Sequence, residues 1–203
     1  QERTLLELLV KLEEVGMDRI QQVISGGQYA HPTGVFYGGT APVWSNRWLR
    51  GFLGDRLASV RRAAIIDLHT GLGPWGHGEL IASATPGEPL FDRAAALWTD
   101  VKSMMAGDSV SAVLAGDWLA VSDQLAPHAE VTPITIEYGT VDIVTVMQAL
   151  RADAWLWAHG DPRAPDAASV RGQVRAAFAD DDPAWIAACW PRFAEVMTAA
   201  LLA

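Results

Sequence analysis

A continuous apolar run followed by a glycine-rich segment limits most strongly what this chain can fold into. Residues 63–68 are apolar except for Asp67, and residues 71–78 contain four glycines and one proline. The small and β-branched residues predict a strand buried on both faces, and the glycines predict a loop at its carboxyl end. Because open α/β sheets bind ligands outside the carboxyl ends of their strands, we expect a functional site here.

Two polar residues, Asp67 and His69, occupy the junction of this strand and loop. Residues two apart in a strand point to the same face, so the Asp67 carboxylate is placed to orient or polarise the His69 imidazole. The alternative interpretation is a polar strand end with a solvated histidine. The sequence alone leaves both open.

Composition limits the class of protein. The 203 residues, half of them hydrophobic, predict a single globular domain over residues 1–203. A net charge of -9 without a recognised basic and aromatic cluster argues against nucleic acid and membrane surfaces as partners. The single cysteine, Cys189, excludes an internal disulfide and a zinc-thiolate site, and its apolar neighbours predict a buried thiol. No targeting segment precedes the first helical pattern, which leaves the compartment open and favours the cytoplasm.

The first part of the chain alternates helical patterns with one long loop. Apolar residues at helical spacing predict a helix over residues 5–24, with a capping box of Thr4 and Glu7 and an interruption near Gly16. Residues 28–47, rich in glycine, proline and aromatics, predict an ordered loop over or beside a site. Ser45 is predicted to cap the helix that follows.

The remaining patterns predict an alternation of strands and helices. No structure is assigned to residues 109–115. Strands are predicted at residues 79–83 and 131–138, and helices at 89–105, 117–125, 141–158, 167–179 and 183–202, the last capped by Asp182 with Pro183 at its first position.

A carboxylate, Glu137, ends the second long strand just before Gly139 and a helix. In one crevice with His69, it has the placement that a general base needs. The alternative is that Glu137 only complements the dipole of the following helix, an effect of about 0.3–1 kcal/mol. Both interpretations remain open from the sequence.

Several motifs between residues 26 and 140 together resemble the zinc-carboxypeptidase superfamily. The resemblance is to its bacterial branch of uncharacterised carboxypeptidase-like proteins, neighbours of succinylglutamate desuccinylase and aspartoacylase. The motifs are Gly27-Gln28-Tyr29, His31-Pro32, Phe36-Tyr37-Gly38-Gly39, Pro42, Trp44-Ser45-Asn46, Asp67-Leu68-His69-Thr70-Gly71-Leu72-Gly73-Pro74, Gly78-Glu79-Leu80-Ile81 and Glu137-Tyr138-Gly139-Thr140.

This resemblance implies an α/β fold with a mixed, mainly parallel sheet flanked by helices, and a single catalytic zinc. His69 matches the later of the family's zinc-binding histidines, and Asp67 is placed to orient it. Glu137 matches the general base. Zinc lowers the pKa of its bound water to about 7 and polarises the substrate carbonyl. The implied substrate is a small peptide or an N-acyl amino acid.

One departure from the family pattern affects the metal. None of the five histidines is followed by glutamate three residues later, so the early His-x-x-Glu pair is absent. The resemblance therefore implies that this chain is the C-terminal portion of a larger zinc-hydrolase domain, lacking the N-terminal part of the fold. The missing ligands and sheet neighbours are expected from an N-terminal companion chain, or the open strand edge is expected to be covered by self-association.

Six further residues are candidates for substrate binding, each with an ordinary structural alternative. His77 and Glu79 also fit a solvated turn, and Tyr37 and Tyr138 also fit buried packing. Asn46-Arg47 has the composition of the family's substrate-carboxylate pair but lies in a different motif.

Two functions from different classes follow. The leading hypothesis is a zinc-dependent hydrolase of amide bonds, of carboxypeptidase or N-acyl amino acid deacylase type, to which this chain supplies one ligand and the base. The alternative is a catalytically silent binding or assembly module that keeps the fold without metal.

Overall fold

The chain forms an α/β structure in which helices flank a mixed four-stranded sheet. The structure is a computed structural model and describes residues 10, 11 and 13–203, apart from the side chains of residues 18 and 24. The predicted Thr4–Glu7 capping box lies outside the described residues. Within them, no helix has the length and apolar character needed to cross a membrane.

The sheet contains β1 (Arg62–Trp75), β2 (Gly78–Ala82), β3 (Val101–Ser103) and β4 (Glu130–Gly139), in the order β1-β4-β2-β3. The β1–β4 and β2–β3 pairs are parallel, and the β2–β4 pair is antiparallel. A mixed sheet flanked by helices was predicted, and this part of the prediction is confirmed. The apolar runs of β1 and β4 pair along their whole length from Arg62 to Thr70.

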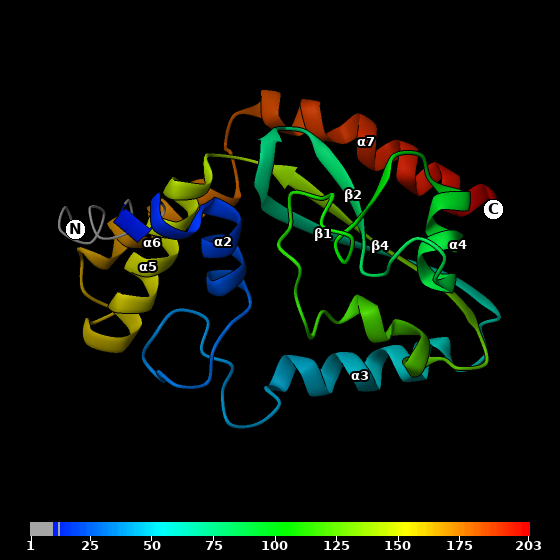
Figure 1. Cartoon of the computed structure of the whole chain (residues 1–203), viewed down its shortest axis with the longest axis horizontal. Helices are drawn as coiled ribbons and strands as arrows, with labels where there is room; N and C mark the ends of the chain where they lie inside the picture. The colour runs from blue at the N-terminus through cyan, green and yellow to red at the C-terminus, as the bar shows by residue number, and fades with distance from the viewer. Residues whose placement is uncertain (1–9, 12) are drawn as a thin grey trace.

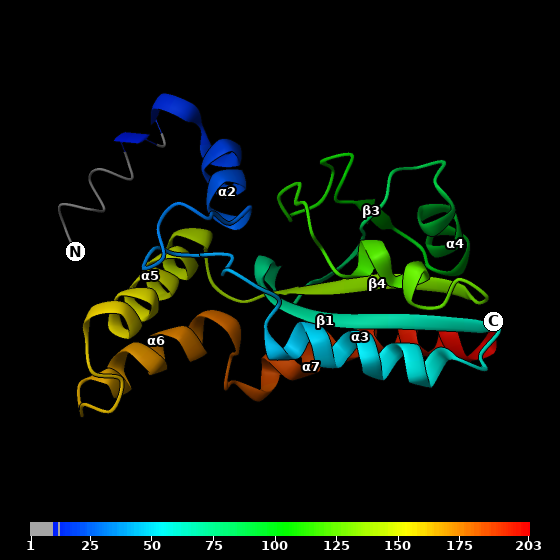
Figure 2. The same cartoon turned by 90° about the horizontal axis from the view of Figure 1, so that it is seen from below.

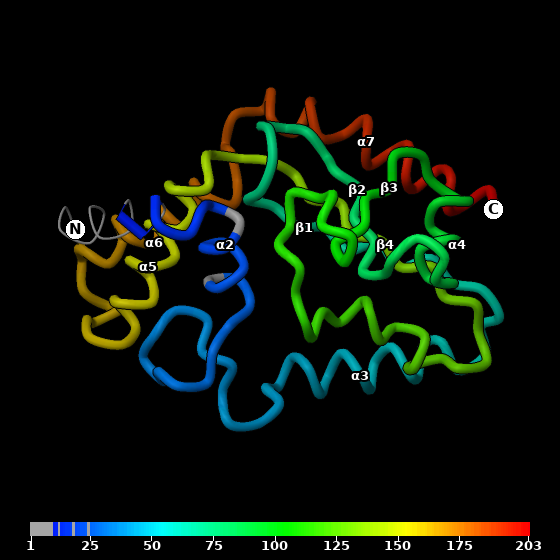
Figure 3. The backbone as a smooth tube through the Cα atoms, in the orientation of Figure 1, coloured from blue at the N-terminus to red at the C-terminus, as the bar shows by residue number. Residues whose placement is uncertain are grey.

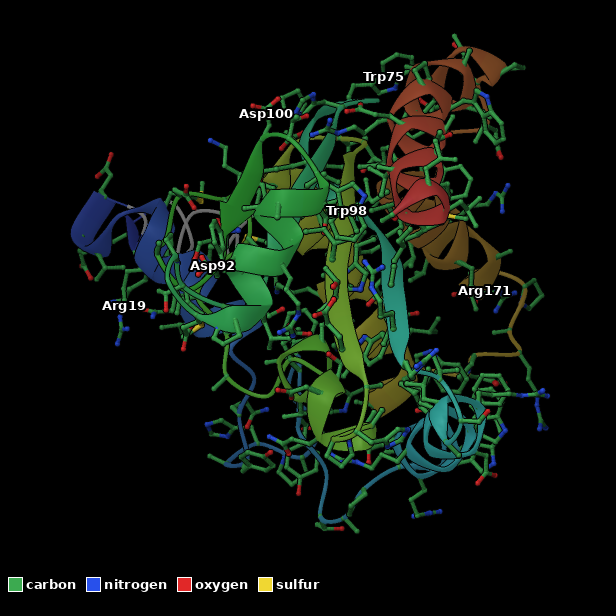
Figure 4. All side chains as sticks on the ribbon, turned by 90° about the vertical axis from the view of Figure 1, so that its right-hand side faces the viewer. Arg19, Trp75, Asp92, Trp98, Asp100 and Arg171 are labelled. Atoms are coloured by element: carbon green, nitrogen blue, oxygen red, sulfur yellow. The ribbon has the colours of Figure 1, made fainter. Side chains whose placement is uncertain are left out.

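Helices lie on both faces of the sheet. On one face, α7 (Pro183–Leu202) and α4 (Pro89–Leu97) pack in one cluster with Ile134 and Ile136 of β4. On the other face, α3 (Trp44–Leu57) packs with Ile65 and Val131, and Figure 2, which views the strands from this side, shows α3 in front of α7. Figure 4 views the molecule from another side and shows Trp98, just after α4, between α4 and α7, where its indole Nε1 donates to the Val196 carbonyl at 3.0 Å. The main core joins α4, α7, β2 and β4 and contains Trp98, Ile134, Ile136 and Trp185.

A second group of helices lies at one end of the sheet. Residues on either side of Gly16 are helical, and Gly16 itself adopts φ +81°, so the predicted interruption is confirmed before α2 (Met17–Ser25). Helices α5 (Ile143–His159) and α6 (Ala167–Phe178) pack together through Val146, Ala149 and Ala177. In the backbone trace of Figure 3, these two helices and α2 occupy the same end of the molecule.

Two predicted helices are shorter or of another type. Helix α4 ends at Leu97, and residues 101–103 form β3, because Asp100 takes a left-handed conformation (φ +58°) that turns the chain back to pair with β2. The segment predicted as helix 117–125 is a 3₁₀ helix, η1 (Leu119–Leu125).

Three further predictions need correction. Ser45 lies inside α3, whose N-cap position is Val43. β1 continues through the expected loop to Trp75, where it pairs with Gly139. β1 is also not buried on both faces, since it lies at the edge of the sheet and the Leu68 side chain is 54% exposed.

The C-terminal prediction is confirmed in detail. Asp182 caps α7 by accepting from the Ala184 amide, and Pro183 occupies the first turn. Cys189 is buried between this helix and the sheet, as predicted.

Candidate active site

The site is built on Asp67 and His69, two residues apart on β1. His69 Nε2 lies 3.0 Å from Asp67 Oδ2, and Trp118 Nε1 donates to the same oxygen at 2.8 Å. Partial burial alone would raise the pKa of Asp67, but these two hydrogen bonds outweigh it and hold the pKa below its ordinary value. An ionised carboxylate only accepts hydrogen bonds, so Nε2 carries the proton and the neutral ring has its lone pair on Nδ1.

Glu137 lies opposite His69 in the β1–β4 register. Its Oε2 is 3.9 Å from His69 Nδ1, so the structure brings the two residues together as the sequence predicted. The residue is only 6% exposed, and its Oε1 accepts from the Leu72 backbone amide at 3.1 Å. Burial raises its pKa to about 7, against the lowering effects of the Leu72 amide and His69.

The protonation states of this cluster suit chemistry at neutral pH. The hydrogen bond to Asp67 raises the pKa of His69 above its ordinary value in spite of partial burial, with smaller contributions from the charges of Glu137 and Asp117. A carboxyl with a pKa of about 7 is able to accept and return a proton at little free-energy cost near neutral pH. Proton transfer is therefore the chemistry that the arrangement supports.

Glu79 adds a second carboxylate beside Glu137. The two residues are direct partners in the antiparallel β2–β4 pair, and the charge of Glu79 contributes to the raised pKa of Glu137. Glu79 Oε1 also accepts from the Val110 amide at 2.8 Å, and Gln21 Nε2 donates to the Val110 carbonyl at 2.9 Å. These two hydrogen bonds hold residues 109–118 next to the site. No structure was predicted for residues 109–115.

Two candidates lie on the other side of the sheet. Tyr138 follows Glu137 in β4, so it points to the opposite face and is buried in the main core, where its hydroxyl has no hydrogen-bond partner. His77 lies in the turn between β1 and β2 and lines a surface pocket of about 460 Å³ together with Arg192 and Lys102.

The other three candidates lie in the segment before β1. Asn46 accepts from Arg50, and Arg47 donates to the Pro42 carbonyl, so both bond locally at the start of α3. Tyr37 pairs with Gln28 in an isolated β-bridge within the long loop. The structure therefore groups Asp67, His69, Glu137 and Glu79, and gives these three separate surroundings.

Two contacts of the site were not predicted from the sequence. The Leu72 amide reaches Glu137 because β1 bends across the end of β4 beyond Thr70, where the pairing register shifts. Trp118 lies in the segment predicted as a helix over residues 117–125, and its indole N–H contacts Asp67. Neither contact has a local sequence signal, since each depends on segments about fifty or more residues apart.

The fold and site define an α/β protein with an acid–imidazole cluster of Asp67, His69, Glu137 and Glu79, in which Glu137 is buried, Asp67 is half-buried and His69 is exposed on the edge strand β1. The chain belongs to the family described as protein of unknown function DUF2817, whose model matches residues 2–192. Comparisons of the chain with curated proteins and with solved structures found no significant match.

Proposed function

We propose that this chain carries the general base and one metal ligand of a zinc-dependent amide hydrolase, of carboxypeptidase or N-acyl amino acid deacylase type. The observation that supports the proposal is the direct pairing of buried Glu137 with His69, whose other ring nitrogen is bonded to Asp67. A carboxylate that orients a metal-binding histidine from behind is a recurrent arrangement in zinc enzymes.

The described residues do not by themselves complete a zinc site. Among them, no group of three or more His, Cys, Asp or Glu side chains is arranged to hold a metal ion. Catalytic zinc takes three protein ligands, and His69 Nδ1 is the one nitrogen that this cluster leaves available. The proposal therefore requires further ligands from outside the described residues, and no reaction step is assigned to the metal here.

The roles of the chain's own residues follow from their contacts. Glu137, with a pKa of about 7, accepts a proton from the attacking water and returns it to the leaving amine. The Leu72 amide fixes one oxygen of Glu137, which leaves Oε2 directed toward His69. Asp67 fixes the proton of His69 on Nε2.

The test combines zinc binding with hydrolysis of N-acyl amino acids and of short peptides with a free carboxyl end. It uses the full-length protein. Glu137→Gln should keep zinc and lose about 10²–10⁴-fold in kcat, whereas His69→Ala should lose zinc affinity. Glu130→Gln and His159→Ala change exposed residues of the same types and should behave like the unmodified protein.

Two results would overturn the proposal. Near-normal turnover by Glu137→Gln would remove the general base. A full-length protein that binds no zinc and hydrolyses none of these substrates would favour the binding or assembly module instead.

A further inference from the structure

Trp118 is the residue outside the acid–imidazole cluster with the most direct contact to it. Its indole Nε1 donates to Asp67 Oδ2 at 2.8 Å, and the same oxygen accepts from His69 Nε2 at 3.0 Å. One carboxylate oxygen thus holds two ring N–H donors from different parts of the chain.

The neighbours of Trp118 hold it in place. Asp117 accepts hydrogen bonds from the Ser83 hydroxyl at the end of β2 and from the Leu119 amide. Leu119, on the other side, is 1% exposed and anchors the start of η1 in the protein interior. Since both flanking residues are fixed, the indole is presented to Asp67 in a defined position.

The other tryptophans with hydrogen-bonded indoles provide a comparison. Trp98 and Trp185 donate to backbone carbonyls, those of Val196 and Gly139, which is ordinary satisfaction of a buried donor. Trp75 donates to a carboxylate, that of Asp180 at 2.7 Å, at the exposed end of β1 near the start of α7 (Figure 4). Trp118 differs from all three because the group it holds is in turn bonded to His69.

We propose that Trp118 is a positioning residue, which fixes the Asp67 carboxylate so that His69 keeps its proton on Nε2 and presents Nδ1 to Glu137. An aspartate has free rotation about its Cβ–Cγ bond unless its oxygens are held. With the indole in place, Oδ2 is fixed by a donor independent of His69, so the imidazole plane is fixed as well. This inference deepens the proposed function and rests on it for its effect on turnover.

The variant Trp118→Phe removes the indole N–H and keeps an aromatic ring. In the full-length protein it should lower kcat about 10-fold or more with KM little changed, the usual range for partners that orient a catalytic histidine. The matched control is Trp75→Phe, which also removes an indole donor to an aspartate and should leave kcat unchanged. A normal kcat in Trp118→Phe would overturn the inference.

A double-variant comparison separates positioning from folding. If Trp118 acts through Asp67, then Trp118→Phe should cause no further loss in an Asp67→Ala background. An equal fold-loss in both backgrounds would mean that the indole supports the structure in general, and would contradict the inference.

A spectroscopic measurement keeps the inference testable if no hydrolase activity is found. With ¹⁵N-labelled indoles, the Trp118 N–H resonance is identified by its absence in Trp118→Phe. Asp67→Ala should shift this resonance and leave that of Trp75 in place. A shift without activity supports the contact and counts against the proposed reaction, whereas an unmoved Trp118 resonance overturns the positioning role itself.

Discussion

At the scale of single residues, the environment of Glu137 is the most consequential. Its carboxyl group is almost fully removed from water, and the structure provides one backbone amide and a partly exposed imidazole as its polar partners. Desolvation disfavours the charged form more than these contacts favour it, so the pKa rises to about 7. The folded protein therefore binds a proton here over a pH range in which the unfolded chain does not.

This difference predicts a pH dependence of stability. Because the pKa of Glu137 in the folded protein is raised above its ordinary value of 4.5, its contribution to stability is fully present below about pH 4.5 and is lost as the pH rises through 7. The free energy of unfolding of the metal-free protein should fall by up to about 3 kcal/mol over this range on account of this group. Urea unfolding between pH 4.5 and 8 measures it.

The comparison is with Glu137→Gln, which cannot ionise. The stability difference between the two proteins should change with pH in the direction just given, while Glu130→Gln, at an exposed position, should run parallel to the unmodified protein. A difference that is constant across the range would contradict the prediction.

Sequence reasoning found part of this site and missed the rest for a physical reason. Asp67 and His69 were predicted as a same-face pair because period-two geometry is a local property of the sequence, although they lie within β1 rather than at its end. Glu137 was predicted from the end of its strand, and it lies near the carboxyl end of β4. The Leu72 amide and the Trp118 indole were not predicted, because a bend of one strand and a loop held by Glu79 bring them to the site. The zinc ligation and the reaction remain predictions.

At the scale of elements, the crossing of β1 over the end of β4 fixes the shape of the site. Gly139 lies directly beneath this crossing, and a Cβ atom there would overlap the carbonyl oxygens of Gly73 and Pro74. The Gly76 amide donates to the Gly139 carbonyl at 2.9 Å, and this hydrogen bond holds the residue after β1 against the end of β4. The absence of a side chain at Gly139 is therefore what allows β1 to approach Glu137.

Gly139→Ala should destabilise the fold by about 2 kcal/mol or more, because the backbone of one strand must move. Gly172→Ala is the matched control: that glycine lies within α6 with open space around it, so alanine should stabilise the helix by up to about 1 kcal/mol. Thermal or urea unfolding of both variants decides the matter. Equal effects in the two variants would show that the crossing is not tight.

The elements themselves were predicted where local signals agree. Caps and periodicity placed α7, and an alternating pattern placed β4. The end of α4 was missed because β3 has only three residues and exists by pairing with β2. A strand that short has too little sequence pattern of its own to be recognised.

At the scale of the whole molecule, the sheet ends at the strand that carries the site. Within the described residues β1 pairs with β4 on one side and forms the edge of the sheet on the other (Figure 1). Edge strands of folded proteins are normally short, charged or covered, and β1 is fourteen residues long with an apolar run over residues 63–66. The expectation of an N-terminal companion chain or a second copy at this edge stays a prediction.

Hydrogen exchange on the full-length protein tests that prediction. The outward-facing amides of residues 63–69 should be protected, and native mass spectrometry should show either a companion segment or a self-associated species. A monomer without a companion segment, in which these amides exchange rapidly, would contradict it.

Asp67 also affects the chain before it has folded, because it lies next to the apolar residues at the start of β1. Residues 63–66 form an uncharged apolar run without proline at the start of β1, and an apolar strand that is exposed during folding can pair with other chains. Arg61 and Arg62 precede this run and Asp67 follows it, so charges flank it at both ends in the manner of gatekeeper residues. The charge at position 67 therefore favours solubility during synthesis as well as the orientation of His69, and Asp67→Glu keeps the first property while changing the second.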